Sequence, residues 1–166
     1  MITNIAPHIF VSSYKHIMSN DHVEPPASKP QTYHAVIHGA LALCALILAA
    51  ELFSGGQLPA SSEFQILDLL QFVILQPTLE TIVFQFAVFR FLRTVRLSYF
   101  LIVGLSALAF TVSHLVFDPN APLLFIAFAG TVLAYLYYFW LKRNRRTAFV
   151  LALLVHSLYN YYLLYA

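Results

Sequence analysis

Residues 64–92 read FQILDLLQFVILQPTLETIVFQFAVFRFL and carry a carboxylic acid, Glu80, inside a long apolar run. A helix needs about 20 mostly apolar residues to cross the hydrocarbon core, so this stretch is long enough to span with tilt or with a kink at Pro77. A charged residue such as Asp costs roughly 2.5–3.5 kcal/mol at the centre of a membrane helix on insertion scales. Glu80 therefore needs a structural or functional reason for its position.

Four other stretches have the same apolar character, and each comes close to the length of one membrane span. They cover about 34–54, 98–116, 122–141 and 147–165. Short turn-rich segments separate several of them, such as Gly55-Gly56 and Asp118-Pro119-Asn120. The pattern predicts an all-α protein, a multi-pass transmembrane helix bundle of about five spans, with one domain over 34–166. Residues 1–33 are more polar and are expected to form a cytoplasmic N-terminal tail.

The composition argues against a soluble fold. The chain has 166 residues, of which 60% are hydrophobic and 10% are charged, whereas soluble domains carry about 25% charged residues. The mean hydropathy of +0.76 points the same way. A net charge of +2 is too small to indicate a nucleic-acid partner. The apolar composition makes the lipid bilayer the expected environment. The single cysteine, Cys44, cannot form an intrachain disulfide.

The basic residues predict the orientation of the bundle. Five antiparallel spans place all nine Lys and Arg residues on one side of the membrane. They are Lys15 and Lys29 in the tail, Arg90, Arg93 and Arg96 after the second stretch, and Lys142, Arg143, Arg145 and Arg146 after the fourth. The positive-inside rule assigns this side to the cytoplasm. We therefore expect a cytoplasmic N-terminus and a location in the cell (inner or plasma) membrane.

The polar residues of three stretches are predicted to lie in one layer. At about 1.5 Å per residue, Glu80, His114, His156 and Asn160 fall roughly 14–24 Å from the basic end of their spans. Tilt can absorb this spread. His156 and Asn160 are four residues apart, so both side chains lie on one face of the last helix. A carboxylic acid, two imidazoles and a carboxamide are thus expected to converge.

Two neighbours at the same spacing are expected to support this set. Gln76 precedes Glu80 by four residues, so its amide can hydrogen-bond the carboxyl group. Phe110 precedes His114 by four residues and can form an apolar wall beside the imidazole.

The converging groups permit a hydrolytic reaction. A buried carboxylate beside an imidazole can take a proton from water as a general base. A second imidazole and a carboxamide can donate hydrogen bonds to the oxyanion of a tetrahedral intermediate. Together these groups suffice for peptide-bond hydrolysis without a covalent nucleophile.

At these residues the chain resembles the CAAX protease and bacteriocin-processing (CPBP, or Abi) family of glutamic intramembrane proteases. That family carries Glu-Glu-x-x-x-Arg soon after a proline, then Phe-x-x-x-His, then His-x-x-x-Asn. Here the three motifs read Pro77-Thr-Leu-Glu80-Thr81-Ile-Val-Phe84-Gln85, Phe110-Thr-Val-Ser-His114 and His156-Ser-Leu-Tyr-Asn160. Their order and spacing fit, and the similar region covers about 64–165.

The resemblance implies an intramembrane endopeptidase that cleaves a membrane-tethered or hydrophobic peptide without a cofactor. It implies that Glu80 and His114 activate the attacking water, and that His156 and Asn160 stabilise the oxyanion. The first motif departs from the family pattern, because its second Glu is Thr81 here and its Arg is Gln85. These two residues can hydrogen-bond, but they cannot form the ion pair of the family.

Three other functions remain open at this point. Glu and His side chains are competent zinc ligands, so a zinc-dependent intramembrane hydrolase is one alternative. The lack of a His-Glu-x-x-His helix argues against it. A non-catalytic scaffold or immunity-type membrane protein with the same fold is a second. A proton-coupled carrier is a third, and the lack of an internal repeat argues against it. The sequence indicates neither the substrate nor the oligomeric state.

Overall fold

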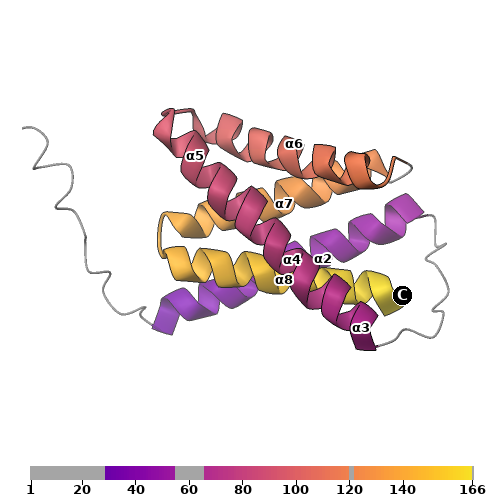
Figure 1. Cartoon of the computed structure of the whole chain (residues 1–166). Helices are drawn as coiled ribbons and strands as arrows, with labels where there is room; N and C mark the ends of the chain where they lie inside the picture. The colour runs from indigo at the N-terminus through magenta and orange to yellow at the C-terminus, as the bar shows by residue number, and fades with distance from the viewer. Residues whose placement is uncertain (1–28, 55–65, 120–121, 166) are drawn as a thin grey trace, which may run out of the picture.

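The computed structural model describes residues 29–54, 66–119 and 122–165, and every regular element within these ranges is helical (Figure 1). The elements are α2 (Lys29–Ser54), α3 (Ile66–Leu69), η1 (Leu70–Leu75), α4 (Gln76–Glu80), η2 (Thr81–Ala87), α5 (Val88–Thr94), α6 (Tyr99–Phe117), α7 (Leu123–Leu141) and α8 (Arg145–Tyr165). The segments from α3 to α5 follow one another without a break and cross the bundle as one long helical run. The predicted all-α fold is therefore confirmed.

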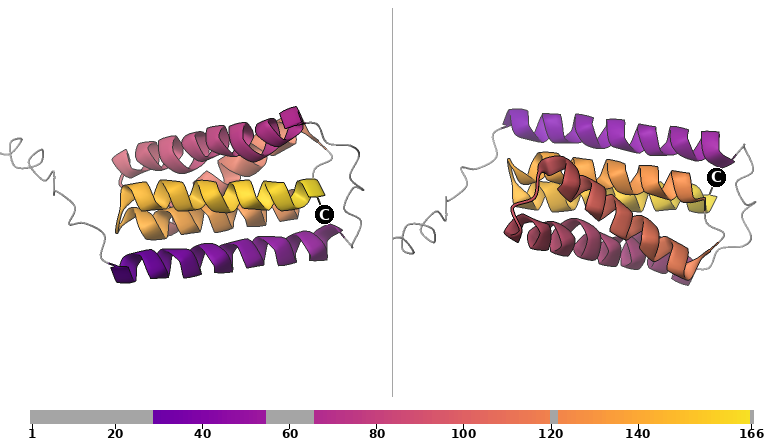
Figure 2. Two further views of the ribbon diagram at one scale, coloured as in Figure 1. Left: turned by 90° about the horizontal axis from the view of Figure 1, so that it is seen from below. Right: turned by 90° about the horizontal axis from the view of Figure 1, so that it is seen from above.

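The helices form three layers, with α7 and α8 in the middle (Figure 2). α2 covers one side of this pair, and the α3–α5 run covers the other side together with α6. Small residues allow α7 and α8 to lie close together: Ala129, Ala134, Ala148 and Ala152 are all buried. α7 and α8 thus provide the scaffold on which the other helices are placed.

Five of the helical runs are long and apolar enough to cross a bilayer, and they match the five predicted spans. Large apolar side chains face outward along them, among them Leu52, Leu79, Phe100 and Leu124. Polar side chains such as Thr81, Gln85 and Ser106 are buried instead. This arrangement is the opposite of a water-soluble protein and fits a lipid surround, in which exposed apolar groups carry no penalty. The protein is a multi-pass membrane protein.

The ends of the spans differ from the predicted ranges by a few residues, and two differences have clear causes. Residues 29–33, which were expected to belong to the tail, form the start of α2. Pro30 is compatible with this, because a proline is tolerated in the first turn of a helix. α8 begins at Arg145 rather than 147, because the Asn144 side chain accepts a hydrogen bond from the Thr147 backbone N–H at 2.9 Å and caps the helix. Residues 1–28 lie outside the described ranges.

The long run around Glu80 is not a regular α-helix. Two π-helical segments, η1 and η2, flank the five α-helical residues of α4. The backbone N–H of Gln76 bonds to the carbonyl of Gln71, five residues back, just before Pro77. Short π-helical segments inside α-helices occur frequently at functional sites. They change which residues face the bundle interior on either side of Glu80.

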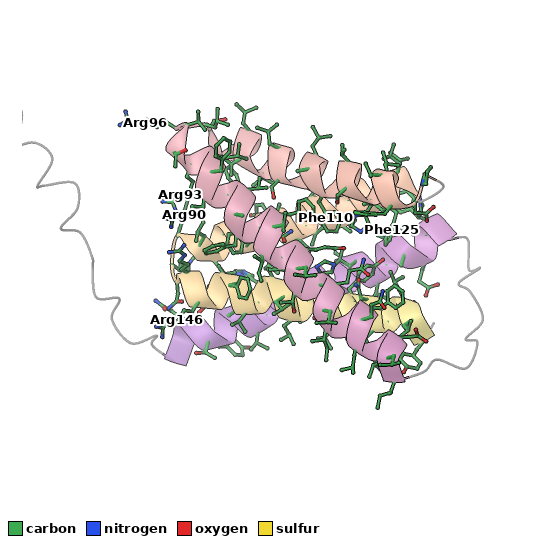
Figure 3. All side chains as sticks on the ribbon, viewed as in Figure 1. Arg90, Arg93, Arg96, Phe110, Phe125 and Arg146 are labelled. Atoms are coloured by element: carbon green, nitrogen blue, oxygen red, sulfur yellow. The ribbon has the colours of Figure 1, made fainter. Side chains whose placement is uncertain are left out.

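The basic residues gather at one end of the bundle, as the span count predicts. Figure 3 shows Arg90, Arg93, Arg96 and Arg146 together at the end where α2 begins and α7 ends. The second span ends there at Thr94, and Arg96 adopts a left-handed backbone conformation with φ 55°. That this end faces the cytoplasm stays a prediction from the positive-inside rule.

A first prediction concerns the close contact of α6 and α7 at Gly130. A Cβ atom there would lie 2.9 Å from the Phe110 ring and 3.3 Å from the Ala107 carbonyl oxygen. Gly130→Ala should therefore push the two helices apart and destabilise the protein by about 1–3 kcal/mol, the usual cost of overpacking. Thermal unfolding in detergent micelles measures the effect.

The matched control for this prediction is Gly104→Ala on α6, where a Cβ atom meets nothing within 4 Å. Because alanine favours a helix over glycine, this variant should be as stable as the wild type or slightly more stable. Equal melting temperatures for the two variants would show that the space at Gly130 does not limit how closely α6 and α7 pack.

A second prediction concerns the orientation in the membrane. In a Cys44→Ser background, Arg143→Cys at the basic end and Pro119→Cys at the opposite end should react differently with a membrane-impermeant maleimide in intact cells. Only Pro119→Cys should be labelled before lysis, because the basic end is expected to face the cytoplasm. The reverse pattern would invert the assignment.

Candidate active site

Glu80 is the centre of the site and comes from the α4 segment of the crossing run. Gln76 Nε2 donates a hydrogen bond to Glu80 Oε1 at 2.9 Å, the contact that the four-residue spacing predicts. Both residues lie within the α-helical part of the run, which preserves this spacing. The carboxyl group is largely buried, with 15% of the side chain exposed. An acid in this setting requires further polar partners.

His114 supplies one of these partners from the last turn of α6. Its Nε2 atom lies 3.7 Å from Glu80 Oε1. Its Nδ1 atom lies 2.9 Å from the Phe110 carbonyl oxygen, which can only accept a hydrogen bond, so Nδ1 carries a proton and donates it. Nε2 is therefore the ring nitrogen that faces Glu80. The distance of 3.7 Å exceeds a direct hydrogen bond and suits a bridging water molecule.

His156 approaches the other carboxyl oxygen from α8. Its Nε2 atom lies 3.3 Å from Glu80 Oε2, and only 4% of its side chain is exposed. Asn160 follows one turn later on the same helix and donates from Nδ2 to the Phe72 carbonyl oxygen at 2.9 Å. One of the two Nδ2 hydrogens remains for another acceptor, because a carboxamide nitrogen carries two.

Three of the four predicted residues line a cavity of about 260 Å³. His114, His156, Asn160 and Gln76 line it, together with mostly apolar side chains of η1, α7 and α8. Glu80 lies beside this cavity, within 3.7 Å of His114 and His156. The structure therefore brings the acid, the two imidazoles and the carboxamide together from three different helical runs. Their catalytic roles stay predictions.

Phe110 organises the imidazoles from within the α6 layer. Its ring centroid lies 4.4 Å from that of His114 and 5.8 Å from that of His156, and its carbonyl fixes His114. Phe84 packs against it edge-on at 5.6 Å. The apolar wall expected beside His114 is thus shared by both imidazoles.

Thr81 and Gln85 occupy the positions where the first motif departs from its pattern, and neither side chain is hydrogen-bonded to Glu80. Both side chains lie on η2 and are 1% exposed. Within the described ranges, their side-chain oxygen and nitrogen atoms have no hydrogen-bond partner. The expectation that these two residues support the site stays untested.

Glu80, His114 and His156 have the chemistry of zinc ligands. Among the residues that the structure describes, no group of three or more His, Cys, Asp or Glu side chains has an arrangement that could hold a metal ion.

One contact of the site was not expected from the sequence. The Phe72 carbonyl on η1 holds the Asn160 side chain. The acceptor is a backbone group, so no residue type marks it. It becomes a partner because η1 crosses α8 at this level (Figure 1).

Residues 62–162 match a protein family described as type II CAAX prenyl endopeptidase Rce1-like. The matched range contains Glu80, His114, His156 and Asn160. No significant match was found among curated proteins or among solved structures. The matched range covers more than half of the 166 residues, and the chain belongs to the Rce1-like family of CAAX prenyl endopeptidases.

Proposed function

We propose that this protein is a glutamic-type intramembrane endopeptidase that hydrolyses a peptide bond of a membrane-tethered or hydrophobic substrate. The observation that carries the proposal is the position of Glu80, whose two carboxyl oxygens lie 3.7 Å from His114 Nε2 and 3.3 Å from His156 Nε2. Membership in a family of membrane endopeptidases supports the reaction class.

In the proposed reaction, a water molecule sits between Glu80 and His114. Glu80 takes a proton from the water as the oxygen attacks the carbonyl carbon of the scissile bond. In this mechanism the His114 ring holds its proton on Nδ1, and Nε2 accepts a hydrogen bond from the same water and orients it. The proton then passes from Glu80 to the leaving amine as the C–N bond breaks, which restores the carboxylate and releases an acid and an amine.

The negative charge that develops on the substrate carbonyl oxygen needs donors. Asn160 retains one Nδ2 hydrogen after its bond to the Phe72 carbonyl, and that bond fixes the amide plane. His156 lies on the same face of α8 and lines the same cavity. In the proposed mechanism both donate to the oxyanion, where preorganised donors contribute most to the rate.

The walls of the cavity favour an apolar substrate. Phe72, Phe125 and Leu163 line it beside the polar groups, and the bundle around it faces lipid. A soluble peptide would have to leave water to enter, whereas a hydrophobic or lipid-modified peptide is already in the membrane. A prenylated CAAX peptide is the natural first probe, because the family is described by that substrate class.

The central prediction is that Glu80→Gln and His114→Ala abolish cleavage. Each should lower kcat by about 100- to 10,000-fold, the usual contribution of a general base or its partner. Cleavage of a prenylated CAAX peptide and of unmodified hydrophobic peptides by purified protein in vesicles, read by mass spectrometry, measures the loss.

The control for this prediction is Glu51→Gln, which changes another carboxyl group within a span. Glu51 accepts a hydrogen bond from Tyr162 and does not line the cavity, so this variant should cleave normally. Wild-type cleavage by the Glu80 and His114 variants would refute the mechanism. Loss of wild-type activity with a zinc chelator, restored by zinc, would replace it with the zinc-dependent alternative.

A further prediction separates the oxyanion donor from the water-activating pair. Asn160→Ala should lower kcat by about 100- to 1,000-fold with little change in KM, because an oxyanion donor acts mainly in the transition state. Steady-state kinetics on the same peptide provide both constants. An increase in KM alone would assign Asn160 to substrate binding instead.

A further inference from the structure

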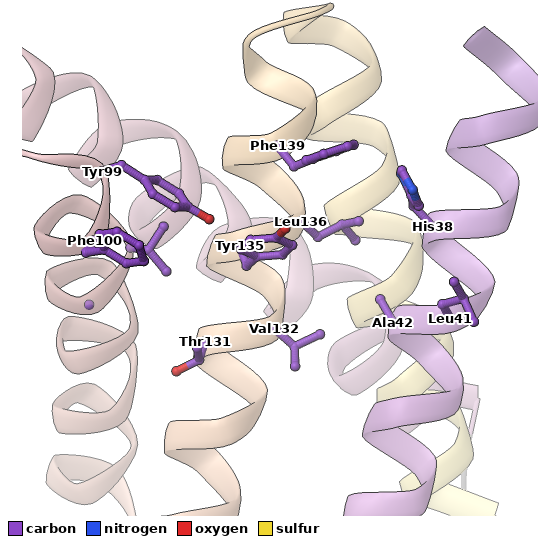
Figure 4. Close-up of a pocket in the computed structure, with 12 residues that line it drawn as sticks. His38, Leu41, Ala42, Tyr99, Phe100, Thr131, Val132, Tyr135, Leu136 and Phe139 are labelled. Carbon is purple, nitrogen blue, oxygen red and sulfur yellow. The ribbon is translucent and has the colours of Figure 1, made fainter. Parts of the chain in front are cut away.

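A second cavity lies in the basic half of the bundle, away from Glu80. Its volume is about 710 Å³, within the range of about 300–1,000 Å³ that is usual for ligand pockets. α2 and α6 both pack on α7, and the cavity is the space between them along α7 (Figure 4). We call it the α7 groove; its walls include His38, Leu41, Phe100, Val103, Thr131 and Phe139.

The α7 groove has the depth of one membrane leaflet. It runs along α7 from Thr131 to Phe139, which at about 1.5 Å per residue is roughly 12 Å. One leaflet accounts for half of a hydrocarbon core of about 30 Å. The walls are mostly apolar, and Figure 4 shows Val132, Leu136 and Phe139 of α7 on the side that faces α2. These dimensions suit a single hydrocarbon chain that lies parallel to the helices.

Two cations stand at the end of the groove nearest the membrane surface. Lys142 Nζ lies 5.8 Å from the ring centroid of Tyr99, and the Arg143 guanidinium carbon lies 3.9 Å from that of Phe139. Both aromatic rings line the groove. The carboxyl side chains in the described residues, Glu51, Asp68, Glu80 and Asp118, lie in mid-span or towards the other end of the bundle. The two cations are therefore positioned to bind an anion from outside the protein.

We propose that the α7 groove binds one acyl chain of an anionic phospholipid, with the phosphate group at Lys142 and Arg143. Lipid tails are as apolar as the groove, so the chain itself gains mainly van der Waals packing. Selectivity must then come from the headgroup. Each Lys or Arg near the membrane surface favours an anionic lipid by on the order of fivefold.

The charges also argue against a second copy of the protein as the occupant. A copy inserted in the same orientation would bring its own basic end next to Lys142 and Arg143, where like charges repel. A phospholipid brings an apolar chain and an anion at the spacing that the groove and its two cations provide.

Gly104 offers a way to fill the groove without damage to the fold. It lines the groove, and a Cβ atom there meets no other atom within 4 Å. A larger side chain at this position therefore enters open space. Leu105→Phe is the matched control, because Leu105 is exposed, lies about 100° further around α6 and does not line the groove.

Trp140 is the single tryptophan of the chain and reports on the groove. Its ring centroid lies 5.7 Å from that of His38 and 5.9 Å from that of Phe139, and both residues line the groove. A bromine atom on a lipid chain quenches tryptophan fluorescence only at short range. A brominated chain in the groove should therefore quench Trp140 strongly.

The test uses the full chain in phosphatidylcholine vesicles that contain increasing fractions of brominated phosphatidylglycerol or brominated phosphatidylcholine. In the wild type and in Leu105→Phe, the same quenching of Trp140 should require a fraction of brominated phosphatidylglycerol that is at least fivefold lower than the fraction of brominated phosphatidylcholine. Gly104→Phe should protect Trp140 from both lipids. Lys142→Gln with Arg143→Gln should keep the quenching but lose the preference for phosphatidylglycerol.

Equal quenching of the wild type by the two lipids would overturn the proposal, and so would an unchanged preference in Gly104→Phe. If neither brominated lipid quenches Trp140 of the wild type, and the protein is a dimer at every lipid-to-protein ratio, the groove is occupied by a second copy of the chain. The assay contains no peptide substrate, and Glu80→Gln should behave as the wild type. Failure of this inference is therefore distinct from failure of the proposed peptidase activity.

Discussion

The need of one buried carboxyl group for polar partners organises this bundle. Glu80 lies at mid-span, where lipid provides no hydrogen-bond partners for a carboxyl group. Its oxygens are instead approached by Gln76, His114 and His156. These partners come from the crossing run, from α6 and from α8. Because breaking such a buried set leaves an uncompensated polar group, the contacts fix the relative position of three helical runs. The proposed hydrolysis depends on the same contacts.

The scaffold that satisfies this constraint is built from small residues. Ala129, Ala134, Ala148 and Ala152 are buried on α7 and α8, which pack on each other, and Gly130 of α7 lies against Phe110 and Ala107 of α6. Lipid provides no hydrophobic driving force between helices, so close packing and interhelical polar contacts must hold them together. α7 packs closely on both α8 and α6. Both cavities described above are lined by residues of α6 and α7 together with residues of other helices.

Much of this arrangement could be predicted from the sequence, for physical reasons. The number of spans was predicted from the apolar stretches that are long enough to cross a bilayer. The periodicity of the α-helix predicted that Gln76 lies beside Glu80 and that Asn160 lies one turn after His156. The basic residues predicted which helix ends lie together. The π-helical segments were not predicted, because the choice between π and α hydrogen bonding depends on how the crossing run packs, and no residue type encodes it. The Asn160 contact with the Phe72 carbonyl follows from that packing.

The two cavities divide the bundle according to chemistry. The site around Glu80 gathers one carboxyl group, two imidazoles and two carboxamides, and it does so in the half that lacks Lys and Arg. The α7 groove lies in the basic half, where aromatic rings and cations meet the membrane surface. The cations are separated from Glu80 along the helix axis, and Gln85, at the position of the family's Arg, adds no charge beside it.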